Sequence, residues 1–139
     1  MLDVIDLTIK RKIKEIELGK KPAAIFIDSE SRQIFVSNPE SNNISVLNLS
    51  DNSHFFIEAG NSPLGISFDS SRNNIFVSNW YDDVISVIDL VTKKKKYEIK
   101  VGKSPAGIYF DKNIKKLYVA NRESNNISLV DTEKFEVLK

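Results

Sequence analysis

Residues of the types that enzymes use for chemistry are scarce in this chain. There is one histidine, His54, and there is no cysteine among the 139 residues. The missing cysteines exclude disulfides, thiol catalysis and cysteine metal sites. A histidine that held a metal or haem would need partner ligands at suitable spacing, and His54 has none. No nucleophile elbow, Walker loop or dinucleotide-binding fingerprint occurs either. The sequence therefore predicts no catalytic residue, no metal site and no cofactor, with His54 on the surface.

Aspartates recur at matching positions rather than as a pair. Asp89 and Asp131 follow similar apolar runs, and Asp6 follows a run of the same kind. After the remaining such run, Asn48 stands where the others have an aspartate. These runs belong to successive units of a repeat, and equivalent positions of such units are expected to lie far apart in space. The aspartates are therefore not expected to form a catalytic pair like the two carboxylates of a glycosidase. A short acidic side chain can also accept backbone N–H groups within a turn. We therefore interpret these residues as turn caps.

The elements that carry these residues repeat along the chain. Gly19, Gly60 and Gly102 each begin a G-x-x-P segment, at spacings of 41 and 42 residues. The prolines of these segments are Pro22, Pro63 and Pro105. A period of this length indicates a solenoid, a propeller or another repeat array. The N-terminal "DVIDLTIKRKIKEIELG" aligns with "SVIDLVTKKKKYEIKVG", so half a unit precedes three whole units.

Each unit contains four short runs rich in Ile, Val, Phe and Tyr, bounded by Gly, Pro, Asn, Asp or Ser. Such runs are typical of strands separated by turns. The second run of each unit contains "IFV" or "LYV", apolar on consecutive residues, which indicates burial on both faces. We therefore predict an all-β fold of four-stranded antiparallel sheets arranged as β-propeller blades. The single domain 1–139 would divide into a half blade (1–18) and three blades (19–59, 60–101 and 102–139).

Polar residues mark the ends of the predicted strands. The first strand of each unit would begin at the proline, where a missing N–H matters least. It would end at an aspartate that caps the following turn; these are Asp28, Asp69 and Asp111. The second strand would end at an asparagine, a residue that tolerates left-handed backbone angles and hydrogen-bonds locally. These asparagines are Asn38, Asn79 and Asn121.

The repeat resembles the YVTN-type β-propeller family. The motifs that carry the resemblance are "FVSN", "FVSN" and "YVAN", followed by "ISVLN", "ISVID" and "ISLVD". The resemblance covers essentially the whole chain. It implies a propeller of about seven blades and an extracellular or cell-surface location, although the compartment of this chain stays open. Fold alone does not set activity.

Three and a half blades cannot close a ring, so blade faces and strand edges would be left exposed. We expect the ring to be closed by a homo-oligomer. The alternatives are that the chain is a segment of a longer propeller, or that a short stack of blades stands open. Both chain ends supply third and fourth strands, so they duplicate rather than complement each other.

Candidate binding residues lie in the turn that follows the second predicted strand of each unit. These turns are on the face that carries the G-x-x-P segments. The residues there vary between units, as expected where propellers bind ligands. They are Glu40 in the first unit, Trp80, Tyr81 and Asp82 in the second, and Arg122 and Glu123 in the third. A Trp–Tyr pair in a polar turn suits a protein partner or a sugar ring. Packing of this pair onto a neighbouring blade is the alternative.

Charge and hydropathy do not direct the chain to nucleic acid or membrane. The formal net charge is +1. The lysine run from Lys93 to Lys96 is not interleaved with aromatic residues, as a nucleic-acid surface would be. No continuous apolar stretch approaches the length of a membrane-spanning helix.

Two functions are consistent with this sequence. The first is a non-catalytic scaffold, or a ligand-binding and interaction platform, that presents the variable turns of one face. The second is a fragment of a propeller-type enzyme or redox protein whose catalytic residues or cofactor lie outside the chain. The first strands "AAIFI", "LGISF" and "AGIYF" contain no ionisable side chain for acid–base chemistry, which favours the first.

Overall fold

The computed structural model describes the whole chain, residues 1–139. It contains fourteen β-strands and one short 3₁₀ turn, η1 (Pro39–Ser41). The all-β prediction is therefore confirmed. None of its elements is a helix with the length and apolar character needed to cross a membrane.

The strands form four antiparallel sheets, each built from consecutive strands. The half blade contains β1 (Leu2–Asp6) and β2 (Arg11–Ile16). Blade 1 contains β3 (Ile25–Asp28), β4 (Gln33–Asn38), β5 (Asn43–Asn48) and β6 (His54–Glu58). Blade 2 contains β7 (Pro63–Asp69), β8 (Asn74–Asn79), β9 (Val84–Asp89) and β10 (Lys94–Lys100). Blade 3 contains β11 (Pro105–Asp111), β12 (Lys116–Asn121), β13 (Asn126–Asp131) and β14 (Glu136–Val137).

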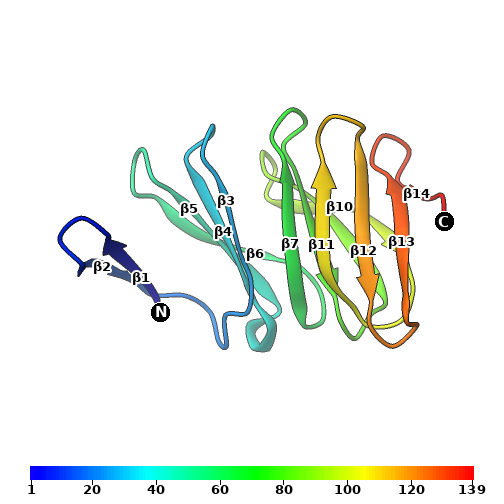
Figure 1. Cartoon of the computed structure of the whole chain (residues 1–139), viewed down its shortest axis with the longest axis horizontal. Coiled ribbons are helices and arrows are strands. Elements are labelled where there is room, and N and C mark those ends of the chain that lie inside the picture. Colours follow the sequence, from blue (N-terminus) through cyan, green and yellow to red (C-terminus); the bar gives the residue numbers. More distant parts are fainter.

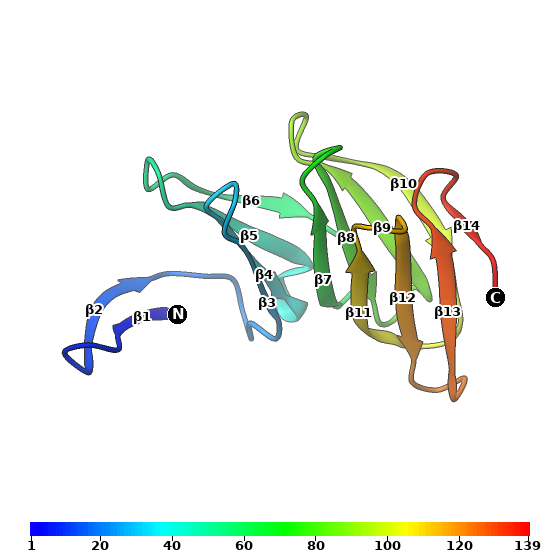
Figure 2. The ribbon, with the colours of Figure 1, turned by 45° about the horizontal axis from the view of Figure 1, so that its top comes forward.

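The sheets pack side by side in chain order and do not close on themselves (Figure 1). The N-terminus lies with the half blade at one end of the long axis, and the C-terminus lies beyond β13 at the other (Figures 1 and 2). This arrangement is consistent with the blades of an open propeller. Two sheet faces, one at each end, consequently lack a neighbouring four-stranded sheet.

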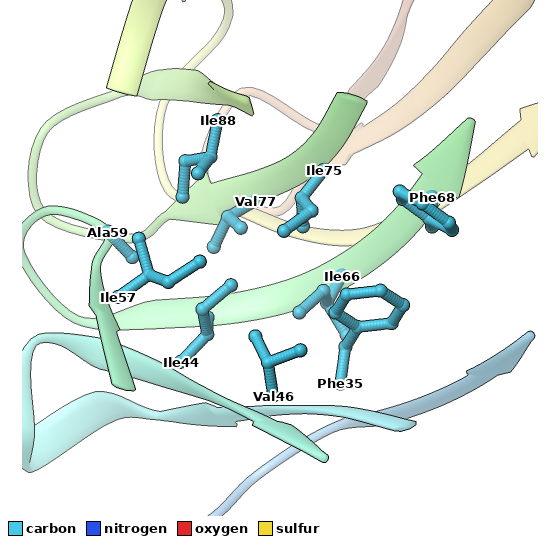
Figure 3. Packing of buried hydrophobic residues seen from close by; sticks show 10 residues of the cluster. All are labelled: Phe35, Ile44, Val46, Ile57, Ala59, Ile66, Phe68, Ile75, Val77 and Ile88. Atoms are coloured by element: carbon cyan, nitrogen blue, oxygen red, sulfur yellow. The ribbon is translucent and has the colours of Figure 1, made fainter. Parts of the chain in front are cut away.

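The main core lies between blades 1 and 2. Its ten buried residues pair one face of blade 1 with the facing side of blade 2: Phe35, Ile44, Val46, Ile57, Ala59, Ile66, Phe68, Ile75, Val77 and Ile88. Figure 3 shows the side chains of the two sheets pointing toward one another. The second strands contribute to both of their faces, because Ile75 and Val77 point toward blade 1 while Phe76 packs against blade 3. The consecutive apolar residues of the repeat thus fill two different cores.

The core against the half blade is much smaller than the cores between four-stranded sheets. Eight buried residues fill the contact between blades 2 and 3. Only three buried residues, Ile34, Val36 and Leu47, face the half blade, with Leu2, Ile16 and Leu18 packed partly against them. A two-stranded sheet has too little surface to cover the neighbouring four-stranded one.

The asparagines that end the second strands differ from the expectation of a left-handed backbone. The left-handed residue is the last one of the following turn, at Asn42, Asp83 and Asn125. The asparagines themselves are buried, and the Nδ2 groups of Asn38, Asn79 and Asn121 donate to Ser45, Ser86 and Ser128 Oγ at 2.9, 2.6 and 2.8 Å. They therefore tie the second strand to the third.

Each glycine of a G-x-x-P segment lies directly against the buried asparagine of its blade, which explains why the two residues repeat together. A Cβ atom at Gly19, Gly60 or Gly102 would lie 2.6–2.9 Å from side-chain atoms of the asparagine in the same blade. Gly60 also has a φ of +127°, which L-residues rarely adopt. Close approach of the turn to the buried amide thus requires a residue without a side chain.

The prolines begin the first strand in two of the three blades. β7 begins at Pro63 and β11 at Pro105, but β3 begins at Ile25, three residues after Pro22. In blade 1, Pro22 and Ala23 are exposed, because the half blade has no inner strands to pack against them. The expectation for Pro22 was therefore wrong.

Candidate partner-binding surface

The candidate residues lie in three turns on one side of the molecule. Each turn joins the second and third strands of a blade, at residues 39–42, 80–83 and 122–125. Together with the G-x-x-P segments that precede the first strands, these turns form what we call the turn surface.

Hydrogen bonds within each blade hold the turn surface in place. The third residue of each turn accepts the N–H of the residue after the glycine. Ser41 Oγ accepts from Lys20 N at 2.7 Å, Asp82 Oδ2 from Asn61 N at 2.9 Å, and Ser124 Oγ from Lys103 N at 2.8 Å. Asp82 is therefore engaged in holding the backbone and is not a free binding group.

A second set of hydrogen bonds connects successive blades. Asn42 Oδ1 in blade 1 accepts the N–H of Ser62 in blade 2 at 3.0 Å. Asp83 Oδ1 in blade 2 accepts the N–H of Ser104 in blade 3 at 2.8 Å. Asn125 holds the same position in blade 3, at the end of the row of sheets. The turn surface is thus rigid across the blades that the chain contains.

Trp80 and Arg122 are brought together from neighbouring blades. The guanidinium carbon of Arg122 lies 5.4 Å from the centroid of the Trp80 ring, a cation–π arrangement. Their backbones are held alike, because Trp80 N donates to Ser62 O at 3.0 Å and Arg122 N to Ser104 O at 3.1 Å. Beside them, Tyr81 is 71% exposed. Part of the Trp80 surface is therefore covered by a neighbouring blade, whereas Tyr81 points into solvent.

The acidic candidates are placed differently. Glu40 forms an ion pair with Lys21 of the same blade, which raises the pKa of Lys21 above its ordinary value. Glu123 is exposed and lies next to Arg122 in the chain. Glu40 belongs to blade 1, whereas the other candidates belong to blades 2 and 3: Trp80, Tyr81, Asp82, Arg122 and Glu123.

The opposite ends of the first strands enclose a hollow of about 580 Å³ that sequence reasoning did not single out. The turns after Asp28, Asp69 and Asp111 line it together with Tyr109. Across it, Lys112 Nζ of blade 3 lies 3.9 Å from Glu30 Oε1 of blade 1. The one signal in the sequence was an aspartate at the same position of each unit, and only the side-by-side first strands show that these turns converge.

The aspartates of the hollow are mainly turn caps. Asp28 Oδ2 accepts the hydroxyl and N–H of Ser31, Asp69 Oδ1 those of Ser71, and Asp111 Oδ1 the N–H of Asn113. Asp69 Oδ2 is buried without a hydrogen-bond partner. No group of three or more His, Asp or Glu side chains is arranged to hold a metal ion. His54 is exposed, begins β6 and packs against Phe56.

Comparisons with known proteins show a shared fold. No protein-family model matches the sequence, and no curated protein does. Among solved structures, the chain is similar to a hydrazine synthase chain of Kuenenia stuttgartiensis, with a TM-score of 0.79 and 22% identity, over 91% of this chain and 38% of that one. It is also similar to a functionally unknown protein from Desulfotomaculum acetoxidans DSM 771, with a TM-score of 0.75 and 15% identity, over 91% of this chain and 43% of that one. The chain thus spans about two fifths of the length of these structures.

Proposed function

We propose that this chain is a non-catalytic β-propeller module that binds a partner protein through the turn surface of blades 2 and 3. The observation that carries the proposal is the cluster of Trp80, Tyr81 and Arg122 on backbone that hydrogen bonds fix. Trp, Tyr and Arg are the residue types that dominate binding energy at protein interfaces. A rigid aromatic surface also loses little conformational entropy on binding. The resemblance to YVTN-type repeats agrees with such a role and stays a prediction.

A protein partner fits this surface better than a sugar. Sugar rings stack on an open aromatic face, and Arg122 lies over the ring of Trp80. The stacked guanidinium still offers N–H donors to a carboxylate or backbone carbonyl. Tyr81 adds an exposed ring with a hydroxyl group at its tip. These features favour an acidic or mixed segment of a protein as the partner.

Site-specific photo-crosslinking tests this proposal. A photo-crosslinking amino acid would replace Tyr81 in one variant and Val91 in the control variant. Val91 is equally exposed, but it lies in the turn between β9 and β10, on the other side of the blade. After irradiation with extracts of the source cells, one defined protein should be crosslinked from position 81 and not from position 91. Arg122→Ala and Trp80→Ala should each lower its yield at least about tenfold, as expected for central interface residues.

The isolated partner then allows a direct titration. Trp80 is the single tryptophan, so its fluorescence reports on this surface alone. A saturable change on adding the partner would support the proposal. Equal crosslinking from both positions, or a saturable Trp80 response to a glycan and not to any protein, would overturn it.

A further inference from the structure

The first strand of blade 1, β3, is uncovered on the side of the half blade. Ile25 and Ile27 of β3 are 51% and 57% exposed, whereas the matching residues of β7, Ile66 and Phe68, are each 6% exposed. An apolar hollow of about 180 Å³ adjoins Ile25, lined by residues 22–24 and Val36 and by Leu2 and Leu18 of the half blade. The half blade has no first and second strands to cover β3. We call the whole side of blade 1 that faces the half blade the front face.

The outer side of blade 3 is uncovered as well. Ile127 is 64% exposed, whereas Ile85, its match in blade 2, is fully buried. Tyr109 and Tyr118 are also exposed large apolar residues, and Tyr118 matches the buried Phe76. We call this the back face. The back face has the apolar composition of a buried surface, because the same positions of blades 1 and 2 lie in the cores between sheets.

The two interior contacts show that a back face fits a front face. Phe35 on the back of blade 1 contacts Phe68 on the front of blade 2, with ring centroids 4.7 Å apart. Phe76 on the back of blade 2 contacts Phe110 on the front of blade 3 at 5.5 Å. By the repeat, Tyr118 on the free back face corresponds to Phe35 and Phe76. Ile27 on the free front face corresponds to Phe68 and Phe110.

The polar contacts of the turn surface match in the same way. Asn42 and Asp83 each accept an N–H from the next blade, at Ser62 and Ser104. Asn125 is the matching acceptor on blade 3, and neither its side chain nor the Lys21 N–H forms a hydrogen bond within the chain. Lys21 holds the position of Ser62 and Ser104 in blade 1.

We propose that the back face of blade 3 binds the front face of blade 1 in a second copy of this chain, and that the half blade competes for the same place. The exposed tyrosines would cover Ile25 and Ile27 of the second copy, and Asn125 would accept its Lys21 N–H. Two copies joined in this way at both ends would close a ring of six four-stranded sheets. The contact is head-to-tail, so it forms a closed assembly only if the rotation between blades completes the circle.

Competition follows from the positions that the half blade occupies. Leu2 and Val4 of β1 match Ile127 and Leu129 of blade 3, so both pairs would lie on the same part of blade 1. The half blade is weakly held, with three buried residues beneath it and one hydrogen bond, from Lys14 Nζ to Asn52 Oδ1 at 3.0 Å. Blade 3 would cover more apolar surface, and buried apolar area is the main source of binding free energy. The half blade therefore acts as a replaceable cover over part of the front face, around Ile34, Val36 and Leu47.

Disulfide trapping tests the contact directly, because the chain has no cysteine of its own. Molecules carrying Asn125→Cys are mixed with molecules carrying Lys21→Cys and oxidised gently. We expect a covalent pair of the two, at a yield at least about tenfold above that from Lys21→Cys mixed with Val91→Cys. Asn42→Cys combined with Ser62→Cys in one chain is the positive control, since these residues form the matching contact inside the molecule.

Further variants distinguish crosslinking through a specific contact from crosslinking through random collision. Tyr118→Glu places a charge on the back face and should lower the crosslinking yield at least about tenfold, while Val91→Glu should leave it unchanged. Leu2→Asp combined with Ile16→Asp loosens the half blade and should raise the yield. Circular dichroism confirms that each variant keeps its β-sheet content.

The mass in solution, from light scattering behind a sizing column, completes the test. A dimer that Tyr118→Glu converts to monomer supports the proposal. A monomer at every attainable concentration, with crosslinking no higher than in the Val91→Cys control, overturns it. Loss of crosslinking on loosening the half blade would overturn the competition, because the half blade would then be part of the contact.

Discussion

Blades 2 and 3 have nearly the same sequence pattern and different surroundings. Blade 2 has a four-stranded sheet on either side, and its second strand, β8, is buried along its whole length. Blade 3 has a neighbour on one side only, and its second strand, β12, alternates between buried and exposed residues. The two strands share a three-residue apolar run in the same positions, so the contrast shows that burial in a repeat protein depends on what lies next to a sheet.

The comparison extends to the contacts between sheets. Ser78 in blade 2 accepts the N–H of Gly65 at 2.8 Å and donates to Ala106 O of blade 3 at 2.6 Å. Ser37 in blade 1 makes the same two contacts, with Ala24 N and Leu64 O. The matching residue of blade 3 is Ala120, which has no hydroxyl group. Blade 3 therefore lacks this pair of hydrogen bonds.

The largest contrast is expected for the aromatic residue of the second strand. Phe76→Ala leaves a cavity between blades 2 and 3 and should lower the free energy of unfolding by about 3–5 kcal/mol. Tyr118→Ala at the matching exposed position should cost no more than about 1 kcal/mol at protein concentrations where the chain is monomeric. Urea unfolding followed by circular dichroism measures both. A loss for Tyr118→Ala that grows with protein concentration would mean that a second copy covers the back face, whereas equal losses for both variants in the monomer would contradict the contrast.

A smaller contrast is expected for the matching glycines of the first strand. A Cβ at Gly65 would lie 2.1 Å from Ala106 O of blade 3, whereas a Cβ at Gly107 would meet nothing within 4 Å. Gly65→Ala should therefore force blades 2 and 3 apart and cost about 1–3 kcal/mol. In the monomer, Gly107→Ala should be neutral or stabilise by up to about 1 kcal/mol, since it restricts the unfolded chain. Thermal unfolding of the two variants side by side would reveal whether the order is reversed.

The serine contact should contribute less. Ser78→Ala removes the acceptor for Gly65 N–H and the donor to Ala106 O, and should cost about 1–2 kcal/mol. Ala120→Ser is the reciprocal change in blade 3, where no other sheet of the same chain offers a carbonyl group. Its free energy of unfolding should stay within about 0.5 kcal/mol of the unchanged chain. A clear gain in stability that grows with protein concentration would indicate that a second copy supplies the missing acceptor.

The smallest effect on stability is expected where the second strand begins and the third strand ends, at Lys116 and Asp131 in blade 3. Blade 3 pairs Lys116 with Asp131, where blade 2 has Asn74 and Asp89. The hydrogen bond from Lys116, with those from the Glu133 and Lys134 N–H groups, lowers the pKa of Asp131 from 3.8 to about 2. Because the folded-state pKa is lowered, this stabilisation is present above about pH 4 and is lost as the pH falls toward 2.

Asp131→Asn isolates that contribution. The unchanged chain should lose stability more steeply than the variant as the pH falls from about 4 to about 2. Asp89→Asn, which changes the matching residue of blade 2, is the control and should have a smaller influence on the slope. Parallel pH profiles for the unchanged chain and Asp131→Asn would contradict the assignment.

The candidate site could be predicted only in part from the sequence. Trp80, Tyr81 and Arg122 were selected because their turns vary while the surrounding residues repeat. The stacking of Arg122 on Trp80 could not be predicted, because it joins residues of different blades and depends on how the sheets are rotated against each other. The engagement of Asp82 with Asn61 N–H was also hidden, since a turn aspartate can be free or bound without any change in sequence pattern.

The sequence by itself determined the strands, their order and their turns. These features follow from local chemistry: apolar runs of strand length, a glycine beside each buried asparagine, and aspartates that accept N–H groups two or three residues away. Only the tertiary structure decided which faces are covered. Ile85 and Ile127 are the same residue at the same position of the repeat, yet one is buried and the other exposed. Apolar burial depends on contact between distant segments, so the outcome depends on whether a neighbouring sheet follows.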